Sequence, residues 1–162
     1  MHLLDLEIKN DLDYVGTSFI RTVENVRRIR AFLDGTKVKV ITKIETVEAI
    51  ENLSHILKET DYIMIDRGDL STGVGLENVI WHQNEILKQC LKNNTSAIIA
   101  TQILKSMENK SLPYIAEVSD ITSAVINGAS ALMLSEETAI GQFPVESVKI
   151  LKRVVDTVEQ KI

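Results

Sequence analysis

The sequence contains a single cysteine, Cys90, so it can form no internal disulfide and no cysteine-based zinc site. Only 2 Pro and 7 Gly occur among its 162 residues, which excludes a collagen-like or low-complexity chain. No run of about 18 apolar residues exists that could cross a membrane. Asp5 and Glu7 interrupt the N-terminal segment where a signal peptide would need an apolar run. Together these absences predict a cytoplasmic protein.

Basic residues are also scarce. The sequence has 18 Lys and Arg against 23 Asp and Glu, which gives a formal net charge of -5. Such a chain lacks the positive patch that binds nucleic acid or an anionic membrane, so we expect neither partner. Hydrophobic residues make up 44% of the sequence, which is enough for a packed core. Because no linker interrupts the chain, we expect a single domain over residues 1–162.

Short apolar bursts alternate with segments of helical periodicity. The bursts are rich in Val, Ile and Ala and apolar on both faces, which is typical of buried parallel strands. They predict strands near 14–20, 38–44, 62–66, 96–100 and 130–134. Between and after them, amphipathic patterns predict helices at 23–33, 47–57, 79–91, 117–127 and 145–162. The sequence therefore predicts an α/β fold of five βα units.

Two architectures fit five βα units. One is an open doubly wound sheet, and the other is an arc of five strands from a (β/α)₈ barrel, that is, a partial TIM barrel with covering helices. A complete barrel needs roughly 250 residues, so eight units cannot fit in this chain. The repeat pattern alone leaves both architectures open.

Polar residues collect where the predicted strands end, which is where parallel sheets bind ligands. Glu45 and Asp69 follow two successive strands and could share a hard divalent cation. Lys43 precedes Glu45 by two residues, so both side chains face the same way. The alternative is a simple ion pair of Lys43 with Glu45 or Asp69. Gly68 and Asp69 also open a predicted turn, 68–75, whose glycines would let backbone N–H groups approach an anion.

These residues lie in segments that resemble the later part of the catalytic barrel of pyruvate kinase, from its fourth to its eighth strand. The resemblance covers nearly the whole chain from about Asp5, in the family's order. The segments are 17–21 (TSFIR), 41–45 (ITKIE), 63–70 (IMIDRGDL), 100–107 (ATQILKSM), 116–120 (AEVSD), 133–139 (MLSEETA) and 141–146 (GQFPVE). The ordered set implies the barrel architecture and a place in the phosphoenolpyruvate- and pyruvate-binding barrel superfamily.

The resemblance implies a glycolytic kinase site. Lys43 would meet the transferring phosphoryl group and stabilise the enolate oxygen, and Thr101 would lie beside the enolate carbon that is protonated. The remaining implied roles are metal ligands (Glu45 and Asp69), substrate binding (Arg67, Gly68, Asp69 and Thr101) and polar groups near the proton path (Ser135 and Glu137). The implied cofactor is Mg²⁺ or Mn²⁺, and the implied substrates are phosphoenolpyruvate, pyruvate or another 2-oxo acid.

The sequence departs from the family pattern in several places. Glu136 stands where the family has glycine, 71–73 (STG) replaces glycine–valine–glutamate, and Ile115 replaces an arginine. The first three barrel strands, the lid domain and the C-terminal domain have no counterpart here, and those early strands hold K⁺ and nucleotide phosphates in the family. A looser resemblance of 43–46 (KIET) and 69–71 (DLS) to class II pyruvate-dependent aldolases suggests a metal-dependent lyase as an alternative. The third hypothesis is that the chain is a non-catalytic binding or assembly module.

An arc of five strands leaves two open edges, near 14–20 and 131–134, and unpaired edges promote association. We therefore expect a homo-oligomer, or a partner chain that supplies the missing strands. A truncated sequence is the other explanation, although Met1 before a helical beginning at 3–8 would fit a natural start.

Overall fold

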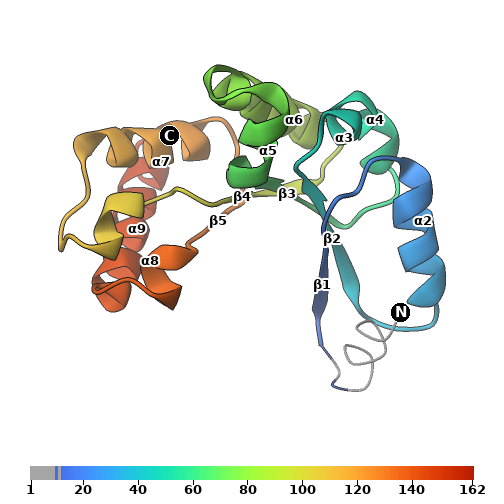
Figure 1. Ribbon diagram of the computed structural model, residues 1–162, viewed down its shortest axis with the longest axis horizontal. Helices are drawn as coiled ribbons and strands as arrows, with labels where there is room; N and C mark the ends of the chain where they lie inside the picture. Colours follow the sequence, from blue (N-terminus) through green and yellow to red (C-terminus); the bar gives the residue numbers. More distant parts are fainter. Residues whose placement is uncertain (1–9, 11) are drawn as a thin grey trace. The chain divides into compact units, whose positions relative to one another are not determined.

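The computed structural model describes residue 10 and residues 12–162, so the expected helical beginning at 3–8 lies outside the described residues. Five parallel strands form one sheet in the order β1-β2-β3-β4-β5 (Figure 1). They are β1 (Tyr14–Thr17), β2 (Lys39–Ile44), β3 (Tyr62–Asp66), β4 (Ser96–Ala100) and β5 (Ala131–Met133). Each strand thus lies beside its successor in sequence, with no reversal of order. This continuous order fits a barrel arc and excludes the doubly wound alternative, whose strand order reverses.

The chain divides into two compact units, residues 1–97 and 98–162. The first unit contains β1 to β3 and the helices that follow them. These are α2 (Val23–Phe32), α3 (Val47–Glu51), α4 (Leu53–Ile56), α5 (Arg67–Val74), a 3-10 turn (Leu76–Asn78) and α6 (Val79–Lys92). In Figure 1 α2 runs alongside β1 and β2. The expected single domain over 1–162 stays a prediction beside this division.

Helix α2 shows how this unit packs. Its apolar stripe, Val26, Ile29 and Leu33, follows helical periodicity, and Val26 is fully buried. Leu33 packs in one buried cluster with Val15 of β1 and Val40 of β2. Strands β1 and β2 alternate buried and more exposed residues, whereas β3 is buried from Ile63 onward. The expectation that every strand is apolar on both faces therefore holds best for β3.

The expected helix at 47–57 is interrupted at Asn52, which separates α3 from α4. The Asn52 side-chain amide donates to the carbonyl oxygens of Arg21 and Glu48, at 3.1 and 2.9 Å. An asparagine that bonds its neighbouring backbone competes with helix continuation. The predicted amphipathic segment is therefore two short helices.

The second unit contains most of β4, then β5 with α7 (Ile115–Ile126), α8 (Glu136–Ala139) and α9 (Pro144–Glu159), and a 3-10 turn (Lys105–Glu108). Helices α7 and α9 pack against each other. Pro144 is the first residue of α9, where its missing N–H costs nothing. Side chains that are fully buried here include Ile103, Leu104 and Met107. Across the described part of the chain, no helix has the length and apolarity needed to span a membrane.

Candidate active site

Strand geometry places Lys43 and Glu45 on one face of the sheet. Lys43 is the last residue but one of β2 and Glu45 is the first residue after it, and side chains two apart in an extended chain share a face. Lys43 is paired in register with Met64 of β3, so Glu45 comes opposite Asp66, the last residue of that strand. The sheet register thus brings a lysine and two carboxylates together at the carboxyl ends of neighbouring strands.

The Lys43 ammonium lies between these two carboxylates. Its Nζ is 2.9 Å from Glu45 Oε2 and 2.9 Å from Asp66 Oδ2, and it donates a longer hydrogen bond of 3.4 Å to Ser18 Oγ. Burial alone would lower the pKa of Lys43, but the hydrogen bonds and charges of Glu45 and Asp66 outweigh it and raise the pKa. Lys43 is therefore held as a cation at neutral pH.

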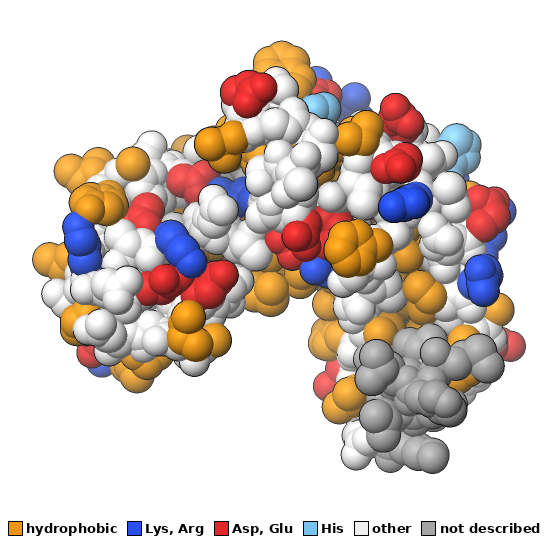
Figure 2. All heavy atoms as spheres, viewed as in Figure 1, with side chains coloured by type: hydrophobic (Ala, Val, Ile, Leu, Met, Phe, Trp, Pro, Cys, Tyr) orange, Lys and Arg blue, Asp and Glu red, His pale blue; other side chains and the backbone are white. Residues whose placement is uncertain are grey.

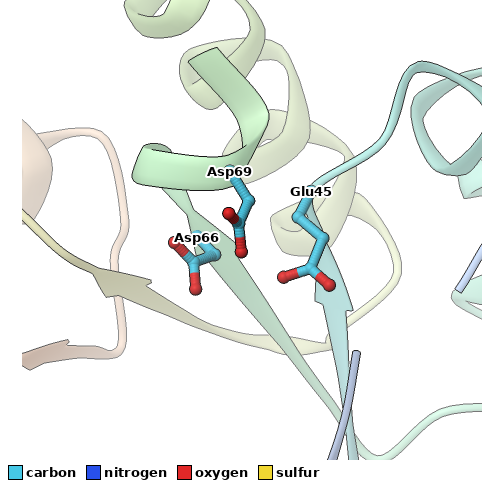
Figure 3. Close-up of side chains that lie close together, drawn as sticks. All are labelled: Glu45, Asp66 and Asp69. Carbon is cyan, nitrogen blue, oxygen red and sulfur yellow. The ribbon is translucent and has the colours of Figure 1, made fainter. Parts of the chain in front are cut away.

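Asp69 adds a third carboxylate from the first turn of α5. Glu45, Asp66 and Asp69 each offer an oxygen within 4.8 Å of the others, and Figure 3 shows the three side chains converging from β2, β3 and α5. Asp69 is exposed, whereas the other two are buried. In Figure 2 a group of acidic side chains is visible at the surface between α5 and the end of β2. We call Lys43, Glu45, Asp66 and Asp69 the acid–lysine cluster.

The turn expected at 68–75 is mostly helix α5, which is a correction to the sequence prediction. Ser71 Oγ donates to the Gly68 carbonyl at 2.7 Å, and Leu70 is fully buried beneath the helix. The helix ends at Gly75, whose φ of 84° requires glycine. Asp69 is thereby fixed by a helical turn and not by a flexible loop.

Glu45 is oriented from its other side by the backbone of the loop that follows β1. The N–H of Phe19 donates to Glu45 Oε1, so Oε2 is the oxygen that faces the cluster. Among the described residues, buried Oε2 has the ion-pair contact with Lys43 but no hydrogen bond of normal geometry. A buried carboxylate oxygen in this situation, with two further carboxylates nearby, suits a hard divalent cation that prefers oxygen ligands.

A cavity of about 290 Å³ opens beside this cluster. Glu45 and Asp69 contribute to its wall, together with Phe19, Arg21, Thr46, Val47, Glu48, Thr72 and Gly73. The candidate cation ligands are thus reachable from an open space in the first unit. This volume is at the small end of ligand sites, and it fits a molecule of a few heavy atoms.

The other predicted site residues in the first unit stand at the start of α5. Arg67 and Gly68 are its first two residues, and Arg67 is 6% exposed. The N-terminal turn of a helix favours an anion, because the helix dipole is positive at that end. This arrangement is compatible with the substrate-binding role expected for Arg67, Gly68 and Asp69.

Thr101, Ser135 and Glu137 belong to the second unit. Thr101 follows β4 with φ of 68°, and Gln102 after it has φ of 54°, a left-handed conformation that is rare outside glycine. Glu137 is fully buried, and its two oxygens accept hydrogen bonds from the backbone N–H groups of Leu104 and Ser135, at 2.9 and 2.8 Å. Through these bonds Glu137 holds the backbone at Leu104 and Ser135 together within the second unit. Its expected place near the proton path stays a prediction.

Asp66 is the functional candidate that sequence reasoning missed. Its position at the end of a predicted strand was visible, but the expected partners of Lys43 were Glu45 and Asp69. The signal that identifies Asp66 is the pairing of β2 with β3, which sets it opposite Glu45. That register cannot be read from either strand alone.

Comparisons with known proteins agree with the expected family. The model of the pyruvate kinase barrel domain matches residues 2–148. A pyruvate kinase from Thermoplasma acidophilum is 44% identical over 157 residues, covering 96% of this chain and 29% of the relative. One from Methanocaldococcus jannaschii is 39% identical, covering 94% of this chain and 35% of the relative. A crystal structure of a pyruvate kinase from Cryptosporidium parvum superposes with a TM-score of 0.96 at 32% identity, covering 99% of this chain and 34% of that one. The chain thus spans about a third of the length of these relatives.

Proposed function

Because this chain belongs to the pyruvate kinase family, we propose that it carries part of a divalent-cation-dependent site for enolisation and phosphoryl transfer on pyruvate or phosphoenolpyruvate. The observation that carries the proposal is Lys43 held 2.9 Å from each of two carboxylates, with a third carboxylate beside them. The family match favours this chemistry over the aldolase-type lyase. Use of ADP and binding of K⁺ would need the early barrel strands, which have no counterpart in this chain, so both belong to an assembly in which another chain supplies those strands.

The carboxylates of the acid–lysine cluster fit a magnesium or manganese ion. Glu45 and Asp69 are the proposed ligands, because Glu45 Oε2 is buried without a hydrogen bond of normal geometry and Asp69 borders the open cavity. When bound, a divalent cation supplies positive charge that stabilises a developing enolate or phosphoryl oxygen. This chain's own residues would hold and orient the reactants around it.

Lys43 would stabilise negative charge on the substrate. An ammonium has three N–H donors and no acceptor. Two of them face Glu45 and Asp66, and the third, which makes only the 3.4 Å bond to Ser18 Oγ, can turn toward an enolate or phosphoryl oxygen. Its raised pKa keeps it protonated in this role. The backbone N–H groups at the start of α5, near Arg67 and Gly68, would bind the substrate carboxylate.

In the second unit, Thr101 would protonate the enolate carbon, and Ser135 and Glu137 would be polar groups near the path of that proton. Support for these roles comes from the family match and from the left-handed backbone at Thr101, since strained conformations cluster at functional positions. These three assignments do not affect the test of the cation and lysine roles.

The first experiment follows exchange of the pyruvate methyl protons in D₂O by NMR. We expect exchange that requires Mg²⁺ or Mn²⁺, stops with EDTA, and is lost in Lys43→Met. Lys39→Met is the matched control, because Lys39 lies on the same strand and face but is 55% exposed. Equal exchange in both variants would contradict the role of Lys43. No exchange in the wild type at any protein concentration would favour a non-catalytic binding module.

We also propose that the chain associates with further strands, either in a second copy or in a partner chain. The strands at the two ends of the sheet order, β1 and β5, are its edges in the described part of the chain. Exposed strand edges promote pairing. Light scattering after size exclusion distinguishes the two, because a monomer of 18.1 kDa at all concentrations would contradict association with a second copy and leave a partner chain.

A further inference from the structure

Lys43 has two acidic partners, and only one of them is a cation ligand in the proposed function. Glu45 Oε2 and Asp66 Oδ2 lie at the same distance of 2.9 Å from Nζ. The family resemblance gives roles to Lys43 and Glu45 but none to Asp66. The function of this second carboxylate therefore needs its own explanation.

Binding of a cation at Glu45 would disturb the ion pair that Glu45 makes with Lys43. Glu45 Oε1 already accepts from the Phe19 N–H, so Oε2 is the oxygen left for both Lys43 and a cation. A divalent ion beside an ammonium also repels it, because like charges at short range oppose each other strongly in a poorly solvated site. Without a second anchor, Lys43 would swing away when the site is loaded.

We propose that Asp66 is a positioning residue, which keeps the Lys43 ammonium in place when a divalent cation occupies Glu45 and Asp69. This inference rests on the proposed function. It assigns Asp66 to the lysine and not to the cation, so that loading of the site leaves Lys43 aimed at the substrate.

The position of Asp66 suits this role. It is the last residue of β3, directly opposite Glu45, and the first helical residue of α5 follows it. Its short side chain is 11% exposed, so it has little freedom to leave Lys43. With all groups ionised, three carboxylates and one ammonium give the cluster two net negative charges, which one divalent cation balances. Without Asp66 the loaded cluster would carry one excess positive charge and would expel Lys43 more readily.

The test measures the mobility of Lys43 directly by NMR of its ε-methylene group, assigned by the loss of its signals in Lys43→Arg. A lysine held in one orientation has two distinct Hε resonances, whereas rapid rotamer averaging merges them. Spectra are recorded with and without Mg²⁺ for the wild type, Asp66→Asn, Asp66→Glu and the exposed control Asp34→Asn. The Mn²⁺ dissociation constant of each variant is measured by electron paramagnetic resonance.

We expect two Hε resonances in the wild type and in Asp34→Asn, both with and without Mg²⁺. In Asp66→Asn they should merge when Mg²⁺ is added, while the Mn²⁺ dissociation constant stays within about threefold of the wild type. Asp66→Glu should restore the separation at least in part. Persistent separation in Asp66→Asn would overturn the proposal, and so would a loss of Mn²⁺ affinity as large as that of Asp69→Asn, which would make Asp66 a cation ligand. Failure of the wild type to bind Mn²⁺ at all would instead overturn the proposed function, and this inference with it.

Discussion

The backbone N–H of Phe19 donates a hydrogen bond to Glu45 Oε1, which ties the loop after β1 to the carboxylate that directly follows β2. Phe19 reaches this position with φ of 53°, in the left-handed region that non-glycine residues rarely adopt. The donor is main chain, and the Phe19 side chain itself is 64% exposed. Glu45 is thus oriented by the backbone of the loop after β1 and not by the side chain of residue 19. Its second oxygen is left to face Lys43.

Removing a proposed cation ligand should weaken divalent metal binding. We expect Glu45→Gln and Asp69→Asn each to raise the Mn²⁺ dissociation constant by at least about tenfold, because a neutral amide is a poorer ligand for a hard cation. Glu51→Gln is the control, since Glu51 is exposed on α3 and outside the cluster. Isothermal titration calorimetry with Mn²⁺ measures all three. An unchanged affinity in Asp69→Asn would remove that residue from the site.

Glu137 should matter for the stability of the second unit. Replacing it by alanine leaves the N–H groups of Leu104 and Ser135 without their acceptor, at a cost of about 1–3 kcal/mol for each buried donor. Urea denaturation followed by circular dichroism should show a clearly lower midpoint. The neighbouring Glu136→Ala is the control, because the Glu136 side chain is 45% exposed. Equal midpoints in the two variants would show that the Glu137 hydrogen bonds contribute nothing.

Replacement by alanine should destabilise the protein at Gly141 but not at Gly16. A Cβ on Gly141 would collide with the Glu137 carbonyl and lie 3.2 Å from Glu108 Cα, whereas one on Gly16 would meet nothing within 4 Å. Gly141→Ala should therefore lose about 1–3 kcal/mol of stability, and Gly16→Ala should stay within about 0.5 kcal/mol of the wild type. The same urea measurement compares them. A Gly141→Ala variant as stable as the wild type would mean that the backbone around α8 shifts freely.

The Cys90 thiol should be unreactive toward thiol reagents in the folded chain. Burial raises the pKa of its thiol to about 12 from an ordinary 9.0, and the residue is 1% exposed on α6. We expect Ellman's reagent at pH 8 to react with it only after urea is added, because the thiolate is the reactive form. Rapid reaction without denaturant would contradict the burial.

The same thiol also makes the free energy of unfolding fall as the pH rises above about 9. Above pH 9 the unfolded thiol ionises while the folded one stays protonated, so the unfolded state binds fewer protons. The contribution of Cys90 is therefore fully present below about pH 9 and is lost as the pH rises toward 12. Cys90→Ala should show a smaller fall in urea midpoint between pH 8 and pH 10 than the wild type. An identical fall in both would contradict this linkage.

The strands were predictable because their signal is local. All five apolar bursts became strands, with ends a few residues shorter at β1 and β5. The segment 68–75 was harder, since its glycines indicate a turn while the buried Leu70 and the Ser71 hydrogen bond that support α5 depend on tertiary packing. The interruption at Asn52 has the same origin, because one of its bonds goes to Arg21, far away in sequence.

The candidate site also has features that the sequence predicts and features that depend on the tertiary structure. The shared face of Lys43 and Glu45 follows from strand periodicity, so their ion pair could be expected from the sequence. Asp66 could not, because its place opposite Glu45 depends on how β3 is registered against β2. The orientation of Glu45 by the Phe19 backbone was equally hidden, since no side-chain pattern encodes a main-chain donor.

In the acid–lysine cluster, Lys43 and Asp66 lie on the neighbouring strands β2 and β3. Glu45 directly follows β2, and Asp69 lies in the first turn of α5. Lys43 therefore cannot separate from Asp66 by loop motion alone, and parting these two residues requires β2 to part from β3. Such an opening is a sub-global unfolding event, and hydrogen exchange reports it as slow exchange of the amides that join the two strands. The lifetime of the assembled cluster is then set by the lifetime of the sheet, and a cation bound there would slow amide exchange in both strands at once.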